Sequence, residues 1–404
     1  MDPQIQKLIQ EEEERQLSTI NLIASENYPS KAVRAAMGCI FDAKYSEGRP
    51  GKRYYAGIGF IDELETLVED RVRTVFNIDD TWAVNVQPLS GSPANYAIQR
   101  GLLSLGDPIL SLDLSHGGHL SHGAPVSLTG KDFVVSYYHV EKESGLINYE
   151  ELLEVAKENR PKLIIAGYSA YPRVVDFKRI ADIAHSVGAF LLADISHITG
   201  LIISNQHPSP FPHADVVMTT THKSLRGPRG ALIVCREELK EKIFPAVFPG
   251  LQGGPHNNTI AALGVALSEA QSSSFKEYGE NIIKNAQKLA SSLTTLGVTL
   301  VSGGTDNHLM LIDVTPFNMR GKEAQIRLES AGIVVNRNAI PFDPHPPFDP
   351  SGIRIGTPAI TTRGMKEEHM SEIATWLYKV LSDESSAEGV RSEVSNFAKK
   401  FPLP

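Results

Sequence analysis

Short apolar segments alternate with amphipathic helical periods from about residue 60 to residue 275. The apolar segments are PILSLDL, KLIIAG, AFLLADI, ADVVMTT and GALIVC. Each carries Ile, Leu or Val at consecutive positions and is bounded by turn residues, which is typical of strands in a buried, mostly parallel sheet. EELLEVAKENRP and FKRIADIAHSVG lie between strands as helices that stop at Pro161 and Gly188. The pattern predicts an α/β fold with a mostly parallel sheet flanked by helices.

The two ends of the chain have a different texture. The start predicts a helix and then an irregular arm, INLIASENYPSKAV, in which Pro29 starts a second helix. One long helix is predicted from HNNTIAALGVALSEAQ through NIIKNAQKLASSLTTLG, followed by strands HLMLIDV and IVVNR and helices KEAQIRLESAG and EEHMSEIATWLYKVL. We therefore expect an N-terminal arm at 1–39, a large α/β domain at 40–279 and a smaller α+β domain at 280–404.

Composition narrows the functional class. The 404 residues, 41% of them hydrophobic, are enough for about two domains. A net charge of -8 without a long basic cluster argues against nucleic acid as a partner. Cys39 and Cys235 stand far apart, which argues against a disulfide framework or a thiolate metal site and favours a reducing cytoplasm. No segment has the pattern of a signal peptide or a membrane span, so we expect a soluble protein.

Polar residues follow the predicted strands where each strand ends. Asp194 comes directly after AFLLA, Lys223 stands in THK after VVMTT, and YSAYPR follows KLIIAG. Ligands of open α/β sheets bind beyond the carboxyl ends of the strands, so we expect these loops to meet at one edge. SGSPAN, residues 90–95, precedes a helix, and its small residues would let backbone N–H groups approach a phosphate, although an ordinary serine N-cap is an equal alternative.

The combination of these groups points to a cofactor. Alone, Lys223 would be interpreted as a solvated loop lysine and Asp194 as a helix N-cap. An ammonium group near a strand-end carboxylate and a phosphate cradle is instead suited to form a Schiff base with pyridoxal 5'-phosphate. Asp194 would keep the pyridine nitrogen protonated, and His197 would lie beside it on a turn. His222 and Arg229 would shape the surroundings of the lysine.

The segment LSHGGHLSHG carries His116, His119 and His122 at steps of three. Its paired glycines interrupt a continuous helix, and it contains no carboxylate or cysteine, so a metal site is not favoured. Stacking of one imidazole on an aromatic cofactor is an alternative, and structural roles remain open for His116 and His122.

Two further segments carry candidate chemistry. KYSEGRPGKRYYAG, residues 44–57, is dense in groups that transfer protons, although a basic surface loop with packed aromatic rings is equally compatible with it. Arg354 lies between short apolar residues in SGIRIGTPA, where a fixed guanidinium suits a substrate carboxylate or a structural ion pair.

Together these segments resemble the serine hydroxymethyltransferase family nearly end to end. The motifs that carry the resemblance are LIASEN, GKRYY, SGSPAN, SHGGHLSHG, TTTHKSLRGPRG, FPGLQGGP and SGIRIGTPA. The resemblance implies a fold-type I pyridoxal-phosphate transferase, similar to aspartate aminotransferase, that forms a homodimer or homotetramer with active sites at subunit interfaces. The implied reaction converts L-serine and tetrahydrofolate to glycine and 5,10-methylenetetrahydrofolate, reversibly.

The resemblance also implies roles for individual residues. The catalytic residues would be Lys223, Glu47, His119 and Asp194. The residues around the cofactor would also include Ser90, Gly91, Ser92, Ser169, His197, His222, Tyr45 and, from a neighbouring subunit, Gly254. The amino acid would be held by Arg354 with Ser25, Tyr55 and Glu47. The folate contacts would be Leu114, Gly118, Leu120, Asn338, Tyr54 and Phe248.

Three positions depart from the family pattern. Ala56 stands where the family usually shows glycine, Leu89 where it usually shows His or Tyr, and Ser196 where it usually shows alanine. The same cofactor would also serve an aldolase for β-hydroxy amino acids or an α-methylserine hydroxymethyltransferase, which are the alternatives within this chemistry. A non-catalytic or RNA-binding role is disfavoured by the acidic balance and by the intact lysine.

Overall fold

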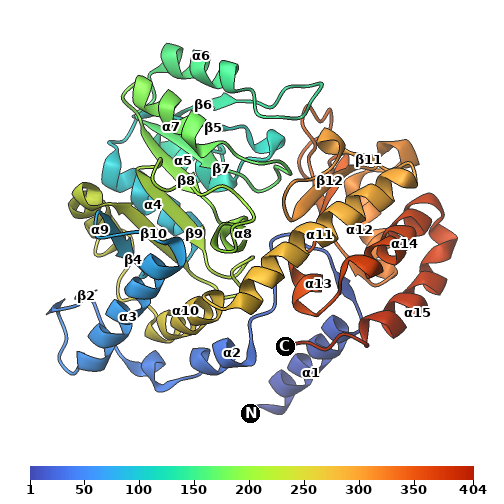
Figure 1. Ribbon diagram of the computed structural model, residues 1–404, viewed down its shortest axis with the longest axis horizontal. Helices are drawn as coiled ribbons and strands as arrows, with labels where there is room; N and C mark the ends of the chain where they lie inside the picture. Colours follow the sequence, from blue (N-terminus) through green and yellow to red (C-terminus); the bar gives the residue numbers. More distant parts are fainter.

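The computed structural model describes all 404 residues, which form a larger and a smaller lobe (Figure 1). The larger lobe contains a seven-stranded sheet with the order β4-β10-β9-β8-β7-β5-β6. Its strands are β4 (Trp82–Asn85), β5 (Pro108–Leu112), β6 (Val134–Tyr138), β7 (Leu163–Gly167), β8 (Phe190–Asp194), β9 (Val216–Thr220) and β10 (Ala231–Arg236). The pairs from β9 to β6 are parallel, whereas β10 is antiparallel to both neighbours. The prediction of a mostly parallel sheet is confirmed.

Both faces of this sheet are buried. Along β8, Leu191 and Ala193 belong to one hydrophobic core, and Leu192 between them belongs to another on the opposite face. Successive side chains of a strand point to opposite faces, which explains why the strands read as continuous apolar runs. The covering helices are α3 (Gly59–Phe76), α4 (Gly91–Leu102), α5 (Leu128–Asp132), α6 (Tyr149–Asn159), α7 (Phe177–Ser186), α8 (Thr199–Ile203), α9 (Lys240–Val247) and α10 (Asn257–Ala270).

The N-terminal arm reaches both lobes. It contains α1 (Pro3–Leu17), β1 (Ile20–Asn21) and α2 (Lys31–Met37). Ser30 caps α2 by accepting the N–H of Val33 at 3.1 Å, so the second helix begins just after Pro29 as predicted. β1 pairs in parallel with β13 (Ile333–Val334) of the smaller lobe, a contact that the sequence pattern does not reveal.

The smaller lobe has an antiparallel sheet covered by helices. The sheet order is β11-β12-β15-β14, with β11 (Thr299–Leu300), β12 (Leu309–Asp313), β14 (Asn336–Asn338) and β15 (Gly352–Gly356). The helices are α12 (Gly321–Ser330), α13 (Pro358–Thr362), α14 (Met370–Ser382) and α15 (Ala387–Ala398). The strand predicted at HLMLIDV and the two predicted helices are therefore present. The strand predicted at IVVNR is instead divided at Val335 into β13 and β14, which belong to different sheets. The register sets Arg354 opposite Leu311 on one side and Asn336 on the other.

The prediction of one long helix after residue 256 is wrong. The chain instead ends α10 at Ala270 and begins α11 (Ser273–Thr295) after Ser272. Ser272 has an extended backbone, and its hydroxyl accepts the N–H of Phe275 at 3.2 Å. This N-cap hydrogen bond satisfies a donor at the start of α11 and so stabilises a break that hydrophobic periodicity does not register.

Helix α11 runs from the larger lobe into the smaller one (Figure 1). Phe275 and Ile282 in its first half pack in the core of the larger lobe. Leu289 and Leu293 in its second half pack in the core of the smaller lobe. One helix therefore contributes to two hydrophobic cores.

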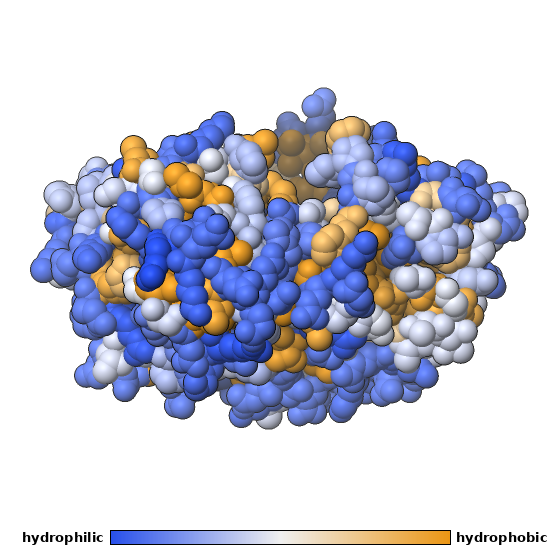
Figure 2. Space-filling model, turned by 90° about the horizontal axis from the view of Figure 1, so that it is seen from above, coloured by the Kyte–Doolittle hydropathy of each residue, from blue (hydrophilic) through white to orange (hydrophobic).

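The surface is mainly hydrophilic in the view of Figure 2, with hydrophobic residues in separate small groups. The helices include none with both the length and the apolar character needed to cross a bilayer. Several exposed apolar side chains are concentrated between residues 40 and 67. They are Ile40, Tyr45, Tyr54, Tyr55, Phe60 and Leu67.

Candidate active site

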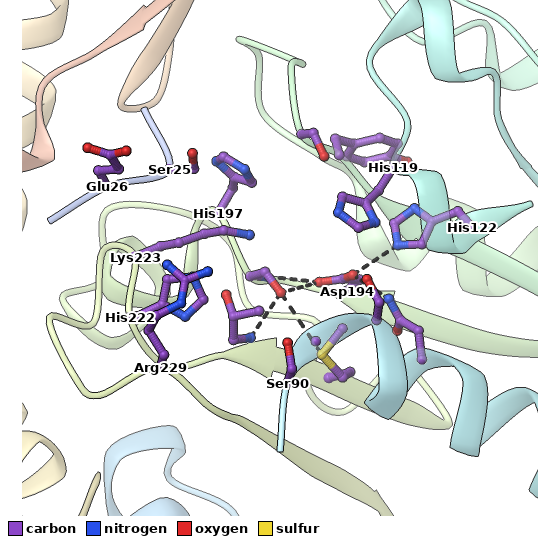
Figure 3. Close-up of a pocket in the computed structure, with 18 of the residues that line it drawn as sticks. Ser25, Glu26, Ser90, His119, His122, Asp194, His197, His222, Lys223 and Arg229 are labelled. Atoms are coloured by element: carbon purple, nitrogen blue, oxygen red, sulfur yellow. Dashed lines mark hydrogen bonds and ion pairs between the residues drawn. The ribbon is translucent and has the colours of Figure 1, made fainter. Parts of the chain in front are cut away.

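A polar cavity of about 410 Å³ opens at the carboxyl edge of the large sheet. The loops after β7, β8 and β9, the N-terminus of α4, the N-terminal arm and β15 all contribute side chains to it (Figure 3). The strand-end loops that were expected to meet therefore lie together. The candidate residues that line the cavity are Ser25, Ser90, Gly91, Ser92, His119, Ser169, Asp194, His197, His222, Lys223 and Arg354.

Asp194 is the anionic centre of this cavity. Its Oδ2 accepts hydrogen bonds from Asn95 Nδ2 and His122 Nε2, both at 2.9 Å, and its Oδ1 accepts from the backbone and hydroxyl of Ser196 at 3.1 and 2.6 Å. Burial alone would raise the pKa of Asp194, but the hydrogen bond from His122 and the charge of Lys223 outweigh it and hold the pKa well below its usual range. Asp194 is therefore a carboxylate at neutral pH.

Lys223 points its ammonium group into the cavity from the turn after β9 (Figure 3). Its backbone carbonyl accepts hydrogen bonds from Asn27 Nδ2 at 2.9 Å and from the backbone of Arg226 at 3.0 Å, which fixes the turn. Only 9% of Lys223 is exposed. Burial lowers the pKa of Lys223 to about 8, although the charge of Asp194 acts in the opposite direction. The neutral amine is therefore accessible near physiological pH.

The lowered pKa of Lys223 predicts a dependence of stability on pH. Below about pH 8 the folded and unfolded chains both hold this proton, so the cost of burying the charge is constant. Between pH 8 and 10.5 the unfolded chain holds more protons, so the free energy of unfolding should rise with pH. The gain relative to Lys223→Met should be roughly 3 kcal/mol. Urea unfolding of both cofactor-free proteins across this range measures it; a flat difference would contradict the shift.

The N-terminus of α4 is suited to bind an anion. Ser90 occupies the N-cap position but makes no capping hydrogen bond with its side chain, so the first N–H groups of the helix remain available to a ligand. A Cβ at Gly91 would come within 2.6 Å of Thr220 Cγ2, so only glycine leaves room here. Thr220 Oγ1 and His222 Nδ1 are buried without a hydrogen-bond partner. These donors and acceptors suit a phosphate group.

Arg354 reaches the cavity from β15 of the smaller lobe. Its Nη1 donates to the carbonyl of Ser169 at 2.6 Å, its Nε to Asn336 Oδ1 at 3.1 Å and its Nη2 to Ser25 Oγ at 3.4 Å. No carboxylate pairs with it. Burial lowers the pKa of Arg354 to about 10, so the guanidinium stays charged at neutral pH. A fixed guanidinium without an acidic partner is suited to bind a carboxylate from a ligand.

His119 and His222 are neutral in the cavity. Burial lowers the pKa of His119 to about 4, and the neighbouring His122 adds to the effect. Burial, Lys223 and Arg229 lower the pKa of His222 to about 3. His119 lies with its ring centroid 5.4 Å from that of His122, whereas His116 packs elsewhere, against His139.

Six candidate residues lie outside this cavity, in a second cluster on the same chain. The residues are Tyr45, Glu47, Tyr54, Tyr55, Phe248 and Gly254. The rings of Tyr45 and Tyr55 are 5.2 Å apart, and those of Tyr54 and Phe248 are 5.9 Å apart. A Cβ at Gly254 would meet Glu47 Cγ at 3.5 Å. All three tyrosines are exposed. The chain therefore presents these groups together at its surface, away from its own Lys223.

The second cluster is held by buried ion pairs. Glu47 precedes a short hairpin of β2 (Gly48–Arg49) and β3 (Lys52–Arg53). Arg53 donates to Glu65 Oε2 at 2.6 Å and to Asp62 Oδ1 at 2.8 Å, both on α3. Because Arg53 and Glu65 are almost fully buried, this pair fixes the hairpin against the larger lobe.

The other four proposed folate contacts also lie outside the cavity. Leu114 and Leu120 are partly exposed on two short 3₁₀ helices, and Gly118 is buried between them. Asn338 is half-buried at the end of β14, where its side chain donates to the carbonyl of Ala339 at 2.7 Å.

Several residues of the cavity were not assigned to it from the sequence. They are Glu26, Asn95, His122, Tyr168, Ser196, Met218, Thr220 and Arg229. Asn95 stands one helical turn after Gly91, so its place on the same face of α4 was a usable signal. A structural role was the interpretation left open for His122. In the structure its side chain donates a hydrogen bond to Asp194. Arg229 was expected near Lys223 but without a binding role.

The cavity has the groups that pyridoxal 5'-phosphate requires. Lys223 offers an amine of lowered pKa, Asp194 a permanent carboxylate for a pyridinium nitrogen, and α4 an uncapped N-terminus for a phosphate. Thr220 Oγ1 and His222 Nδ1 are buried without a hydrogen-bond partner within the chain, so both are available to bind a ligand. The fold and this site define a fold-type I pyridoxal-phosphate enzyme.

Comparisons with known proteins identify the family. The family model described as serine hydroxymethyltransferase matches residues 1–377. The serine hydroxymethyltransferase of Desulfotalea psychrophila is 51% identical over 406 residues, spanning 100% of this chain and 95% of the relative. That of Acidothermus cellulolyticus is 50% identical over 412 residues, spanning 100% and 96%. The chain belongs to the serine hydroxymethyltransferase family.

Membership confirms the class of reaction expected from the sequence. It is a transferase of one-carbon metabolism that interconverts serine and glycine, with pyridoxal 5'-phosphate as cofactor and tetrahydrofolate as co-substrate.

Proposed function

We propose that Lys223 carries the cofactor covalently, that Asp194 pairs with its ring nitrogen, and that Ser90, Gly91 and Ser92 bind its phosphate. The convergence of a buried amine, a carboxylate and an uncapped helix N-terminus on one cavity carries this proposal. When bound, the cofactor supplies an electron sink for the α-carbon of the amino acid. His119, a neutral flat ring, would stack on the cofactor, while Ser169 and His197 would face its phenolic oxygen.

Borohydride reduction tests the covalent assignment. Reduction of the purified protein should leave a pyridoxyl group on Lys223, which peptide mass spectrometry would locate. A protein without a visible cofactor band and without this modification would contradict the proposal.

Arg354 and Ser25 would hold the carboxylate of the amino acid. The guanidinium is charged, buried and free of an acidic partner, so a substrate carboxylate would complete its hydrogen bonding. Fixing the carboxylate would orient the bonds of the α-carbon relative to the cofactor ring, which is the positioning that cleavage of the hydroxymethyl group needs.

A second copy of the chain would complete the site. Glu47, Tyr55 and Gly254 lie together at the surface and away from the cavity of their own chain. In a two-fold dimer the second cluster would reach the cavity of the partner, with Glu47 moving protons, Tyr55 contacting the amino acid, and Tyr45 and Gly254 contacting the cofactor. We propose a homodimer, or a pair of such dimers.

Complementation between two inactive variants tests the shared site. Glu47→Gln and Lys223→Ala should each be inactive alone. Co-expression should restore activity to about a quarter of the wild-type level, because half of randomly paired dimers contain one site with both native residues. Co-expression that restores nothing, although hybrid dimers form, would show that each site draws Glu47 and Lys223 from one chain.

The one-carbon acceptor would bind at the mouth of this composite site. The pterin ring of the folate would contact Leu114, Gly118, Leu120 and Asn338. The benzoyl part of the folate would be lined by Tyr54 and Phe248, both from the second cluster of the partner. Stimulation by tetrahydrofolate distinguishes this reaction from aldol cleavage, which needs no folate. Comparison of L-serine with α-methylserine as substrate distinguishes it from the other transfer. Threonine cleavage without folate that is faster than folate-dependent serine turnover would favour the aldolase.

A cytoplasmic location belongs to the proposal, supported by the free thiols of Cys39 and Cys235.

Gly91→Ala tests the phosphate cradle. The added Cβ would lie 2.6 Å from Thr220 Cγ2, so α4 or β9 must shift and displace the N–H groups from the phosphate. We expect the Kd for the cofactor to rise at least about tenfold, equivalent to about 1.4 kcal/mol. Gly389→Ala on α15 is the matched control, because a Cβ there meets nothing within 4 Å. Equal Kd values for the two variants would rule the cradle out.

A further inference from the structure

Two buried histidines form a pair across the boundary between the lobes. His197 follows β8 of the larger lobe, and His308 precedes β12 of the smaller lobe. Nδ1 of His197 lies 3.2 Å from Nε2 of His308, with the ring centroids 5.4 Å apart and the ring planes inclined by 24°. Rings that lie nearly in one plane and meet edge to edge point the N–H of one along the lone pair of the other. The contact is therefore an N–H···N hydrogen bond.

Both rings are neutral. Burial lowers the pKa of His308 to about 3, with Arg354 and Lys223 adding to the effect. Burial and the charge of Lys223 also lower the pKa of His197 well below its usual range. A neutral imidazole carries one proton, so one ring donates in the pair and the other accepts. The direction of this hydrogen bond decides which nitrogen of His197 faces the cavity with a proton.

The far nitrogens of the two rings set the direction. Nδ1 of His308 is buried and has no hydrogen-bond partner, whereas His197 lines the cavity with its Nε2 unpaired. A proton on Nδ1 of His308 would be a buried donor without an acceptor, and orphaned donors are the rarer and costlier defect. The small cavity beside the pair measures about 10 Å³. A water needs at least ~10–15 Å³, so this space is at the limit for a rescuing acceptor.

We propose that His308 is a positioning residue that selects the tautomer of His197. Nε2–H of His308 donates to Nδ1 of His197, so the proton of His197 resides on Nε2 and faces the cavity as a hydrogen-bond donor. This donor is suited to an anionic oxygen, and the proposed function, on which this part rests, places the phenolic oxygen of the cofactor there. His308 acts only through His197, and it does so from the smaller lobe.

Nitrogen NMR of the cofactor-free protein tests the tautomer directly. In protein labelled with ¹⁵N-histidine, His197 is assigned by its loss in His197→Gln. We expect Nδ1 of His197 to be bare and Nε2 to be protonated, and we expect the other tautomer to become populated in His308→Leu. A protonated Nδ1 in the wild-type protein, or an unchanged His197 in His308→Leu, would overturn the proposal. This measurement needs no cofactor, so it is independent of the proposed function.

Titration with pyridoxal 5'-phosphate measures the consequence. Without His308 the tautomer of His197 is no longer selected, so its hydrogen bond to the ligand is weakened but not abolished, and the Kd of His308→Leu should rise about 3- to 10-fold. His308→Gln should stay near wild type because its amide N–H takes the place of Nε2. His207→Leu, which removes another buried histidine that does not line the cavity, should leave Kd unchanged. Equal Kd changes in the three variants would refute the positioning role, whereas failure of the wild-type protein to bind would refute the proposed function instead.

Discussion

Replacement of Lys223 by alanine should lower kcat for folate-dependent serine cleavage at least about 100- to 1000-fold. Loss of one preorganised group that acts in the transition state costs about 2.7–4 kcal/mol, and Lys223 would provide both the covalent link and a proton acceptor of lowered pKa. Steady-state kinetics with saturating cofactor measure the effect. The cavity should still bind the phosphate end, so the cofactor should remain bound but removable by dialysis.

Lys223→Arg separates charge from covalency. Arginine keeps a cation near Asp194, but its guanidinium is so strongly basic that it stays protonated at neutral pH and offers no free amine as a nucleophile. We expect Lys223→Arg to be as inactive as Lys223→Ala. Lys276→Ala, an exposed lysine on α11, is the control that should retain full activity. Activity above a tenth of wild type in Lys223→Arg would mean that the charge alone is what matters.

Replacement of Arg354 by glutamine should raise KM for serine about 10- to 150-fold. Each charge-assisted hydrogen bond to a carboxylate is worth about 1.5–3 kcal/mol, and the buried guanidinium has no carboxylate partner within the chain. The KM of Arg354→Lys should lie between those of the wild type and Arg354→Gln, because lysine keeps the positive charge but cannot donate two parallel hydrogen bonds to the carboxylate. Initial rates over a range of serine concentrations give KM and kcat separately.

Two controls limit the Arg354 result to substrate binding. The Kd for the cofactor should be unchanged in Arg354→Gln, since the proposed phosphate and ring contacts lie on the larger lobe. Arg337→Gln, an exposed arginine on β14 of the same sheet, should leave KM unchanged. A parallel rise of KM in both variants would point to a general distortion of the smaller lobe and against a carboxylate contact.

The sequence predicts the centre of the site because charged residues are unusual directly after buried apolar strands. A carboxylate that terminates β8 and a lysine just after β9 are costly to bury, so their positions are informative without a structure. The orientation of polar side chains between strands carries no such signal. Asn95 and His122 both donate to Asp194 at 2.9 Å, yet neither spacing nor composition fixes their rotamers.

The same contrast applies to the second cluster around Glu47, which we propose contributes to the site of a partner chain. The hairpin after Glu47 reads as a glycine-rich loop, and only the buried pair of Arg53 with Glu65 shows how it is held. The break at Ser272 was missed for a related reason. A single N-cap hydrogen bond decided it, within an uninterrupted helical period.

Helix α11 couples the thermal unfolding of the two lobes. Its first half loses its packing if the larger core melts, and its second half loses its packing if the smaller core melts. A ligand that bridges Lys223 of one lobe and Arg354 of the other binds only when both are folded, so its binding free energy adds to the stability of the whole chain. The melting temperature of the whole chain should therefore rise with occupancy of the site, for which Lys223 of the larger lobe is the proposed covalent anchor.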